Sequence, residues 1–219
     1  MPLKAIIFDF DGVIAESVDI KTSAFAYLFR NYPDDIIKKI VKFHLDNGGI
    51  SRFEKFKIIY RNFLKKNLSK EEEERLGKEF GEYCYKEVLI CPYVKGAKEF
   101  LENNYRRYML FIVSGTPHEE MNKIVDVRQL RKYFKEVRGT PEDKGKLSKM
   151  ILKTYHLKPA DVVFIGDAPT DYWGAKEVGI PFIARIAPGK YNPFNSDAFN
   201  ISYTIPDLSS LEAILKSMT

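Results

Sequence analysis

Apolar residues follow two different rhythms along the chain. Short apolar runs of four to six residues, the length of buried strands, occur at 5–8, 108–113 and 162–165, and further strands are expected at 135–138, 181–186 and 201–205. Segments in which apolar residues recur every three to four positions, the spacing of amphipathic helices, separate most of these runs. Strands that alternate with helices predict an α/β protein with a mostly parallel sheet covered by helices on both faces.

The helices expected in this part of the chain span 94–104, 117–134, 142–155, 172–178 and 208–218, and a loop is expected at 187–196. Thr116 and Glu119 fit a capping box, with Pro117 at the first helical position. The second of these helices is therefore predicted to begin directly after Thr116.

Residues 14–88 lack the alternation of strands and helices. Helical spacing recurs over 22–30, 35–46 and 52–65, and Ser69 with Glu72 opens a fourth helix. We predict a three-layer, Rossmann-like core of residues 1–15 and 89–219, and an inserted all-helical cap domain of residues 16–88. Because the insert follows the first strand directly, it is expected to lie over the end of the sheet and to close on it like a lid.

The first apolar run ends in two acids and a glycine. Asp9 and Asp11 are two positions apart, so their side chains face the same way on an extended chain, and Gly12 lets the backbone turn away. Open α/β folds bind their ligands at the carboxyl ends of strands. A surface turn that simply ends a strand is the alternative explanation.

The apolar run at 162–165 also ends in acids, Asp167 and then Asp171. Aspartates that stabilise a turn would explain one such run, but not the same design twice. Together with Asp9 and Asp11, these acids form an oxygen-rich cluster at one sheet edge. Such clusters select hard cations, and Mg²⁺ is the usual choice when a phosphate completes its shell.

Two further stretches point to an anion. The run at 108–113 leads into Ser114, Gly115 and Thr116, beside a predicted helix N-terminus whose free N–H groups favour a phosphate. The alternative is that Ser114 and Thr116 only cap that helix. Lys144 lies near the start of another predicted helix, where cations are disfavoured, so it is either solvated or faces a nearby anion.

Composition and charge exclude several classes of partner. The 219 residues carry a formal net charge of +5, but Lys and Arg are scattered, so no nucleic-acid partner is expected. No apolar run approaches the roughly 20 residues that cross a bilayer, and no secretory leader opens the chain. Cys84 and Cys91 lack zinc spacing and suit reduced thiols in the cytoplasm. His44 and His118 are expected to be cap or surface residues, not metal ligands.

In order and spacing, residues 9–13, Ser114, Lys144 and residues 166–171 resemble the four motifs of the haloacid dehalogenase superfamily of phosphohydrolases. The likeness spans residues 4–171. The helical insert resembles the C1 cap of subfamily I members such as the phosphoglycolate phosphatases and β-phosphoglucomutases. The resemblance therefore implies this superfamily's α/β fold and its phosphoryl chemistry.

The resemblance also implies catalytic roles. Asp9 would be the nucleophile that forms an aspartyl-phosphate, and Asp11 would protonate the leaving oxygen and then activate water. The dehalogenase and phosphonatase branches lack a carboxylate at the position of Asp11. Its presence favours a phosphate ester, because an alkoxide leaving group needs a proton.

By the same resemblance, Asp9, Asp167 and the backbone carbonyl of Asp11 would hold Mg²⁺. Asp171 would assist the metal or orient Lys144. The transferring phosphoryl group would be held by Ser114 and Lys144, with Lys146 as the alternative lysine.

Substrate contacts are expected from Gly115 and Thr116 and from two residues outside the motifs. Arg52, in the cap, would hold a substrate anion as a bidentate donor, or it is a solvated residue in the first turn of a helix. Glu16, just past the first motif, is expected to face the pocket.

The resulting prediction is a cytoplasmic, Mg²⁺-dependent phosphatase, a monomer or homodimer, that hydrolyses a small phosphorylated metabolite. A phosphomutase of the β-phosphoglucomutase type would use the same acids. A catalytically silent module that binds a phosphorylated ligand is the third possibility.

Overall fold

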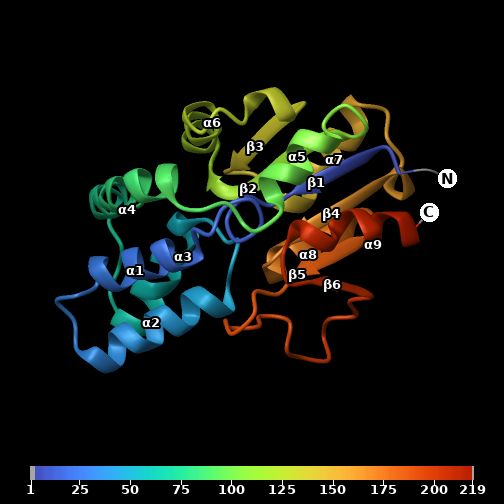
Figure 1. Ribbon diagram of the computed structural model, residues 1–219. Coiled ribbons are helices and arrows are strands. Elements are labelled where there is room, and N and C mark those ends of the chain that lie inside the picture. Colours follow the sequence, from blue (N-terminus) through green and yellow to red (C-terminus); the bar gives the residue numbers. More distant parts are fainter. Residues whose placement is uncertain (1–2, 219) are drawn as a thin grey trace.

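A six-stranded parallel sheet lies at the centre of the computed structural model, which describes residues 3–218 (Figure 1). The strands are β1 (Ala5–Phe8), β2 (Met109–Pro117), β3 (Glu136–Thr140), β4 (Val162–Gly166), β5 (Phe182–Arg185) and β6 (Tyr203–Ile205). Their spatial order is β3-β2-β1-β4-β5-β6, and every neighbouring pair is parallel. The predicted α/β class and parallel sheet are confirmed. Strand order reverses beside β1, which is where open α/β sheets bind ligands.

Alternation along β1 sends its side chains into two separate cores. Ile6 and Phe8 belong to one buried cluster, and Ala5 and Ile7 belong to another, as the two-residue period of a strand requires. All four side chains are fully buried. Burial on both faces explains why this run is apolar throughout and does not alternate with polar residues.

Helices cover both faces of the sheet. They are α5 (Ala97–Asn104), α6 (His118–Val127), α7 (Lys144–Thr154), α8 (Pro169–Val178) and α9 (Leu211–Ser217). Apolar residues of α5, α6 and α9 join the core on the Phe8 face, whereas α7 and α8 pack on the Ile7 face. The result is the predicted three-layer arrangement.

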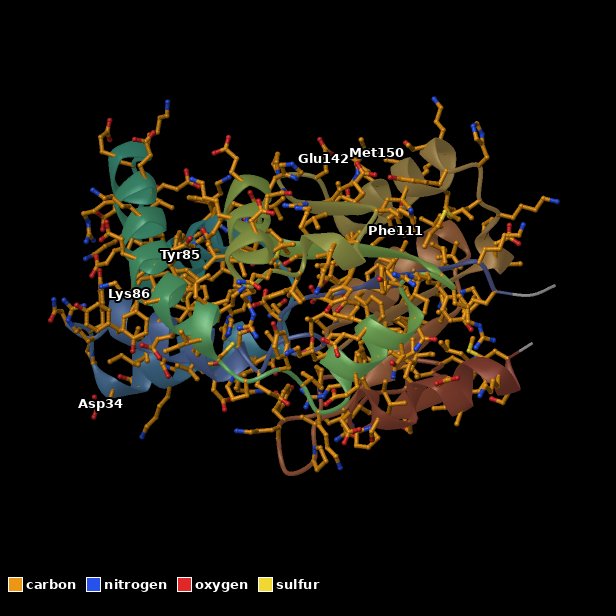
Figure 2. The ribbon with its side chains drawn as sticks, turned by 45° about the horizontal axis from the view of Figure 1, so that its top comes forward. Asp34, Tyr85, Lys86, Phe111, Glu142 and Met150 are labelled. Atoms are coloured by element: carbon orange, nitrogen blue, oxygen red, sulfur yellow. The ribbon has the colours of Figure 1, made fainter. Side chains whose placement is uncertain are left out.

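Residues 18–90, here called the helical region, form four helices and a π-helical turn. The elements are α1 (Val18–Leu28), α2 (Asp34–Asp46), α3 (Arg52–Ile59), the turn η1 (Tyr60–Leu64) and α4 (Lys70–Ile90). In Figure 1 they gather beside the sheet, away from both chain termini. Figure 2 shows Asp34, Tyr85 and Lys86 on this side, well apart from Phe111 in the sheet. Ser69 accepts a hydrogen bond from the Glu72 N–H, which confirms the predicted start of α4.

Aromatic rings that meet edge to face or at a tilt hold the helical region together. The Phe25 ring lies 4.9 Å from that of Phe80 and 5.9 Å from that of Phe56. These rings belong to the same buried cluster that covers the Phe8 face of the sheet. Because one apolar core runs through both parts, the division into two domains stays a prediction. No helix within residues 3–218 is both long and apolar enough to span a bilayer.

Two local predictions are wrong. The helix expected over 117–134 ends at Val127, because Gln129 adopts a left-handed backbone with a φ of 57°, which an α-helix of L-residues does not continue through. Thr116 does not cap α6 either. Strand β2 continues past it to Pro117, and the Thr116 hydroxyl instead donates to Asp11 at 3.2 Å. A tertiary partner has replaced the local one.

Candidate active site

The register between β1 and β4 brings the two acidic motifs together. Phe8 is paired with Ile165, and the Asp9 N–H continues the ladder by donating to the Ile165 carbonyl at 2.9 Å. Both strands therefore end at the same edge of the sheet, and the acids that follow them have to converge. Gly12 then turns the chain with a φ of 74°, a left-handed conformation that glycine adopts without strain.

Three acids form one compact group at this edge. Each of Asp9, Asp167 and Asp171 offers a carboxylate oxygen within 4.8 Å of the others. Asp9 and Asp171 are buried. The Asp171 carboxylate accepts the Ala168 N–H at 3.0 Å, whereas that of Asp167 has no hydrogen-bond or ion-pair partner among residues 3–218.

Burial and repulsion by neighbouring carboxylates raise the pKa of all three carboxyl groups. For Asp167, burial comes first, followed by the negative charges of Asp9 and Asp171. The pKa values of Asp9 and Asp171 are also raised mainly by burial, against the opposing effect of Lys144. A bound cation would relieve this repulsion. Oxygen-only donors with one carboxylate unpartnered fit a hard divalent ion such as Mg²⁺.

Lys144 provides the positive charge at the centre of the group. Its ammonium lies 2.8 Å from Asp9 and 2.5 Å from Asp171, and the side chain is only 4% exposed. Burial alone would lower the pKa of Lys144, but these two carboxylates outweigh it and raise the pKa. Asp143 accepts the Lys146 N–H and caps α7, which fixes Lys144 in the first turn. The Lys146 side chain is 65% exposed and pairs with Glu142, so Lys144 is the lysine that reaches the acids.

The Asp11 carboxylate stands apart from that group. It accepts hydrogen bonds from Ser17 at 2.7 Å and Thr116 at 3.2 Å, and it pairs with Lys21 at 2.5 Å. Burial would raise the pKa of Asp11, but the Lys21 ammonium and these hydrogen bonds lower it below the ordinary value. The side chain of Asp11 is thus held ionised by its own set of donors, separate from the candidate metal ligands.

The end of β2 forms another wall of the site. Ser114 is fully buried, and its hydroxyl accepts the Thr116 N–H at 3.1 Å. Gly115 and Thr116 line the cavity described below, but Ser114 is not among its lining residues. Gly115 lies against the carbonyl of Gly49 in the helical region, and a Cβ at position 115 would overlap that oxygen.

A cavity of about 410 Å³ opens onto these groups. Its walls include Asp9, Asp11 and Asp167 from the sheet edge and residues of α1, α2 and α3 from the helical region. Thr170 donates to the Gly48 carbonyl at 3.0 Å, which ties the loop between α2 and α3 to the start of α8. The sheet edge and the helical region therefore enclose one shared chamber, next to Asp9.

Arg52 and Glu16 both line this cavity, and each has a protein partner. The buried Arg52 guanidinium pairs with Glu120 through Nη2, while its buried Nη1 has no hydrogen-bond partner. Arg52 is therefore not a solvated residue, although it does lie in the first turn of α3. Glu16 binds Arg185 at 2.7 Å. The Gly12 carbonyl also accepts a hydrogen bond from Arg185, at 3.0 Å.

Sequence reasoning missed three cavity residues, Lys21, Arg185 and the buried histidine of α2. His44 was expected in the cap or at the surface; it lies in the helical region but is only 7% exposed. Lys21 could have been found, because it is a cation in the first turn of α1, the same electrostatic mismatch that singled out Lys144. Arg185 carries no such signal.

The chain matches the model of the haloacid dehalogenase-like hydrolase family over residues 6–185. No curated protein sequence matches it. Among solved structures, a β-phosphoglucomutase from Clostridium difficile superposes with a TM-score of 0.77 at 18% identity, covering 99% of this chain and 97% of that one. A predicted phosphoglycolate phosphatase from Haemophilus somnus gives 0.73 at 20% identity, covering 97% of each chain.

A HAD-hydrolase from Bacillus subtilis bound to magnesium also superposes with a TM-score of 0.73 at 16% identity, covering 99% of this chain and 100% of that one. At such identities these likenesses show the shared fold. The family match spans most of the chain, including both strands that carry the acidic motifs. This chain therefore belongs to the haloacid dehalogenase-like hydrolase family.

Proposed function

We propose that this hydrolase is a Mg²⁺-dependent phosphatase that cleaves a small phosphate monoester through an aspartyl-phosphate on Asp9. The observation that carries the proposal is the placement of Asp9. Its carboxylate pairs with Lys144 at 2.8 Å, belongs to a three-acid group, and faces the cavity that Asp11 also lines. A nucleophile and a second carboxylate thus line one chamber, and a cation is paired with the nucleophile.

The first displacement would be made by a carboxylate oxygen of Asp9. The Phe10 N–H donates to Asp9 Oδ1 at 2.6 Å, which holds the carboxylate in one orientation, and Lys144 contacts Oδ2. Attack on phosphorus forms the Asp9 acyl-phosphate bond and breaks the bond to the ester oxygen. Lys144 and the N–H groups near Gly115 would stabilise the charge on the phosphoryl oxygens.

Mg²⁺ would be held by Asp9, Asp167 and the backbone carbonyl of Asp11, with Asp171 assisting or orienting Lys144. When bound, it would neutralise negative charge on the transferring phosphoryl group. The protein's own part is to hold these acids close together, and Lys144 pairs with two of them and opposes the rise in their pKa values.

Asp11 would first protonate the leaving group and then activate the attacking water. The leaving alkoxide needs a proton, and the second step needs a base for the attacking water. Lys21 holds Asp11 in the ionised form that suits the second step. A bound phosphate dianion would attract the Lys21 ammonium away from Asp11 and raise the pKa of Asp11, which suits the first step.

The direct test is release of p-nitrophenol from p-nitrophenyl phosphate by the pure protein with Mg²⁺. We expect release that needs Mg²⁺ and is abolished by Asp9→Asn, with a covalent phosphate detectable on the wild-type protein by mass spectrometry after acid quench. Asp35→Asn, on the exposed face of α2, is the matched control and should keep full activity. Release that survives Asp9→Asn would refute the proposed nucleophile. Binding of phosphorylated ligands without any turnover would instead favour the catalytically silent module.

A phosphomutase of the β-phosphoglucomutase type is the second candidate. The tie between Thr170 and the Gly48 carbonyl favours it, because a chamber closed over Asp9 would keep water from the phosphoenzyme and return the phosphoryl group to the substrate. Isomerisation of a sugar phosphate that requires a sugar bisphosphate, with little free phosphate formed, would decide for the mutase.

A further inference from the structure

Lys55 is a buried lysine that the proposed chemistry does not use. It lies on α3, one turn after Arg52, lines the same cavity as Asp9, and is only 2% exposed. Its ammonium contacts Nδ1 of His44 at 2.9 Å and the His44 carbonyl at 3.2 Å. The centroid of the Phe25 ring lies 5.5 Å from the ammonium. None of these partners carries a negative charge that could balance an ammonium group.

The other cations on the cavity wall are each paired with a carboxylate. The pairs are Lys21 with Asp11, Arg52 with Glu120, Arg185 with Glu16, and Lys190 with Asp19. Lys55 is the exception among the cavity residues that the structure describes, since no ion pair involves it. A buried ammonium without a counter-ion is costly in free energy. An anion that the protein itself does not supply would remove this cost.

The surroundings of Lys55 show how that missing charge affects it. Burial, and then the nearby ammonium groups of Lys21 and Lys144, lower the pKa of Lys55 to about 7, with Asp11 opposing weakly. Burial and the Lys55 charge lower the pKa of His44 to about 2. The His44 ring is therefore neutral, and in the tautomer that carries its proton on Nε2 its Nδ1 accepts a hydrogen bond from Lys55. Every other titratable group that acts on Lys55, from α1 and α7, is a cation, apart from Asp11.

We propose that Lys55 recognises a second anionic group, a carboxylate or a phosphate, on the alcohol part of the substrate ester. The inference rests on the proposed phosphatase function, because it places that group in the same cavity as Asp9. One anionic group would face Asp9 and Lys144 at the sheet edge, and the second would reach the helical region. The substrate class is thus a phosphorylated hydroxy acid or a bisphosphate, and not a neutral alcohol phosphate.

A neutral group would not satisfy this position equally well. A hydroxyl can accept a hydrogen bond from Lys55, but it leaves the charge uncompensated, so the amine would shed its proton instead. An anion stabilises the protonated form and raises the pKa of Lys55. Binding of a doubly anionic ligand should therefore take up a proton near neutral pH, and its affinity should fall as the pH rises above about 7.

Binding measurements separate this proposal from the activity itself. Calorimetric titration with Mg²⁺ at pH 7.5 would compare methylphosphonate, which has one anionic group, with phosphonoacetate and methylenediphosphonate, which add a carboxylate or a second phosphonate. We expect at least about tenfold tighter binding of one of the two double anions. Buffers of different ionisation enthalpy would reveal its proton uptake. Tighter binding of phosphonoacetate would identify the second group as a carboxylate, and tighter binding of methylenediphosphonate would identify it as a phosphate.

Lys55→Met keeps the length of the buried side chain and removes its charge. It should abolish both the preference and the proton uptake, so that methylphosphonate and the two double anions bind with similar affinity. Lys57→Met is the matched control, since Lys57 is an exposed residue of the same helix, and it should behave as wild type. If the wild type shows no preference for either double anion, the proposal is wrong. This comparison uses only the wild-type protein, so it remains valid even where Lys55→Met does not fold. If the wild type does not turn over p-nitrophenyl phosphate at all, the proposed function is refuted instead.

Discussion

Replacing Lys144 by methionine tests the electrostatics at the centre of the site. Methionine retains the length and the apolar stem of the side chain but removes the ammonium that pairs with Asp9 and Asp171. Removing one partner of a buried ion pair costs about 3–5 kcal/mol, against a total stability of roughly 5–15 kcal/mol. For a chain of this size the melting temperature should fall by roughly 10 °C.

The loss should depend on pH, with a definite sign. In the folded protein the pKa values of Asp9, Asp167 and Asp171 lie above the ordinary value of an aspartate, 3.8, and removing Lys144 raises those of Asp9 and Asp171 further. Groups whose folded pKa is raised stabilise the fold while they are protonated, and this stabilisation is lost as the pH rises through the folded value. The destabilisation should therefore be small near pH 4 and grow between pH 5 and 8.

Urea unfolding of the metal-free protein at pH 5 and pH 8 measures the effect. Lys146→Met is the control, because that lysine lies two residues away on the same helix and is 65% exposed; its midpoint should match that of the wild type. The same pair of variants decides between the two lysines for activity, and only Lys144→Met should lose it. A Lys144→Met midpoint equal to that of Lys146→Met, or a loss that does not change with pH, would refute the account of the acid group.

Three further predictions concern the metal, the second acid and the contact with the helical region. Metal-free wild-type protein should become less stable from pH 5 to pH 8, and Mg²⁺ should restore the loss in urea unfolding. Lys21→Met should raise the pKa of Asp11 and move the acid limb of the pH–kcat/KM profile to higher pH; an unmoved limb would mean that Lys21 does not act on Asp11. Gly49→Ala places a Cβ against Thr170 at a φ of 78°, so kcat/KM should fall about tenfold or more. Gly189→Ala has a similar φ but open space around it, and it should not reduce kcat/KM.

The sequence allowed the sheet edge to be predicted because strand ends carry their own signal. An apolar run that stops at an acid defines where a side chain emerges, and two such runs in a parallel sheet must emerge together, as Asp9 and Asp167 do. The position of Lys144 was left open between solvent and an anion. Burial against Asp171 resolves that choice, but it depends on how α7 and α8 pack, which no local pattern records.

Contacts between distant segments could not be predicted from the sequence. The Thr116 hydroxyl was expected to cap α6, and it instead meets Asp11, 105 residues away. Local capping and a tertiary hydrogen bond compete for the same hydroxyl, and the sequence displays only the first. The pairing of Arg52 with Glu120 likewise joins the helical region to α6. No sequence pattern around either residue indicates that the other is its partner.

The helical region and the acid group are joined through backbone as well as through side chains. The Gly49 carbonyl lies against Gly115, and the Gly49 Cα lies near enough to Lys144 that a Cβ would sit 3.2 Å from its ammonium. Side chains at either glycine would hold the two parts of the molecule apart. The loop that carries these contacts leads directly into α3, which bears Arg52 and Lys55. A shift of this loop would therefore move the candidate substrate contacts and uncover the candidate nucleophile together. Under the proposed function, recognition of the alcohol part and access of water to Asp9 would then depend on one structural element.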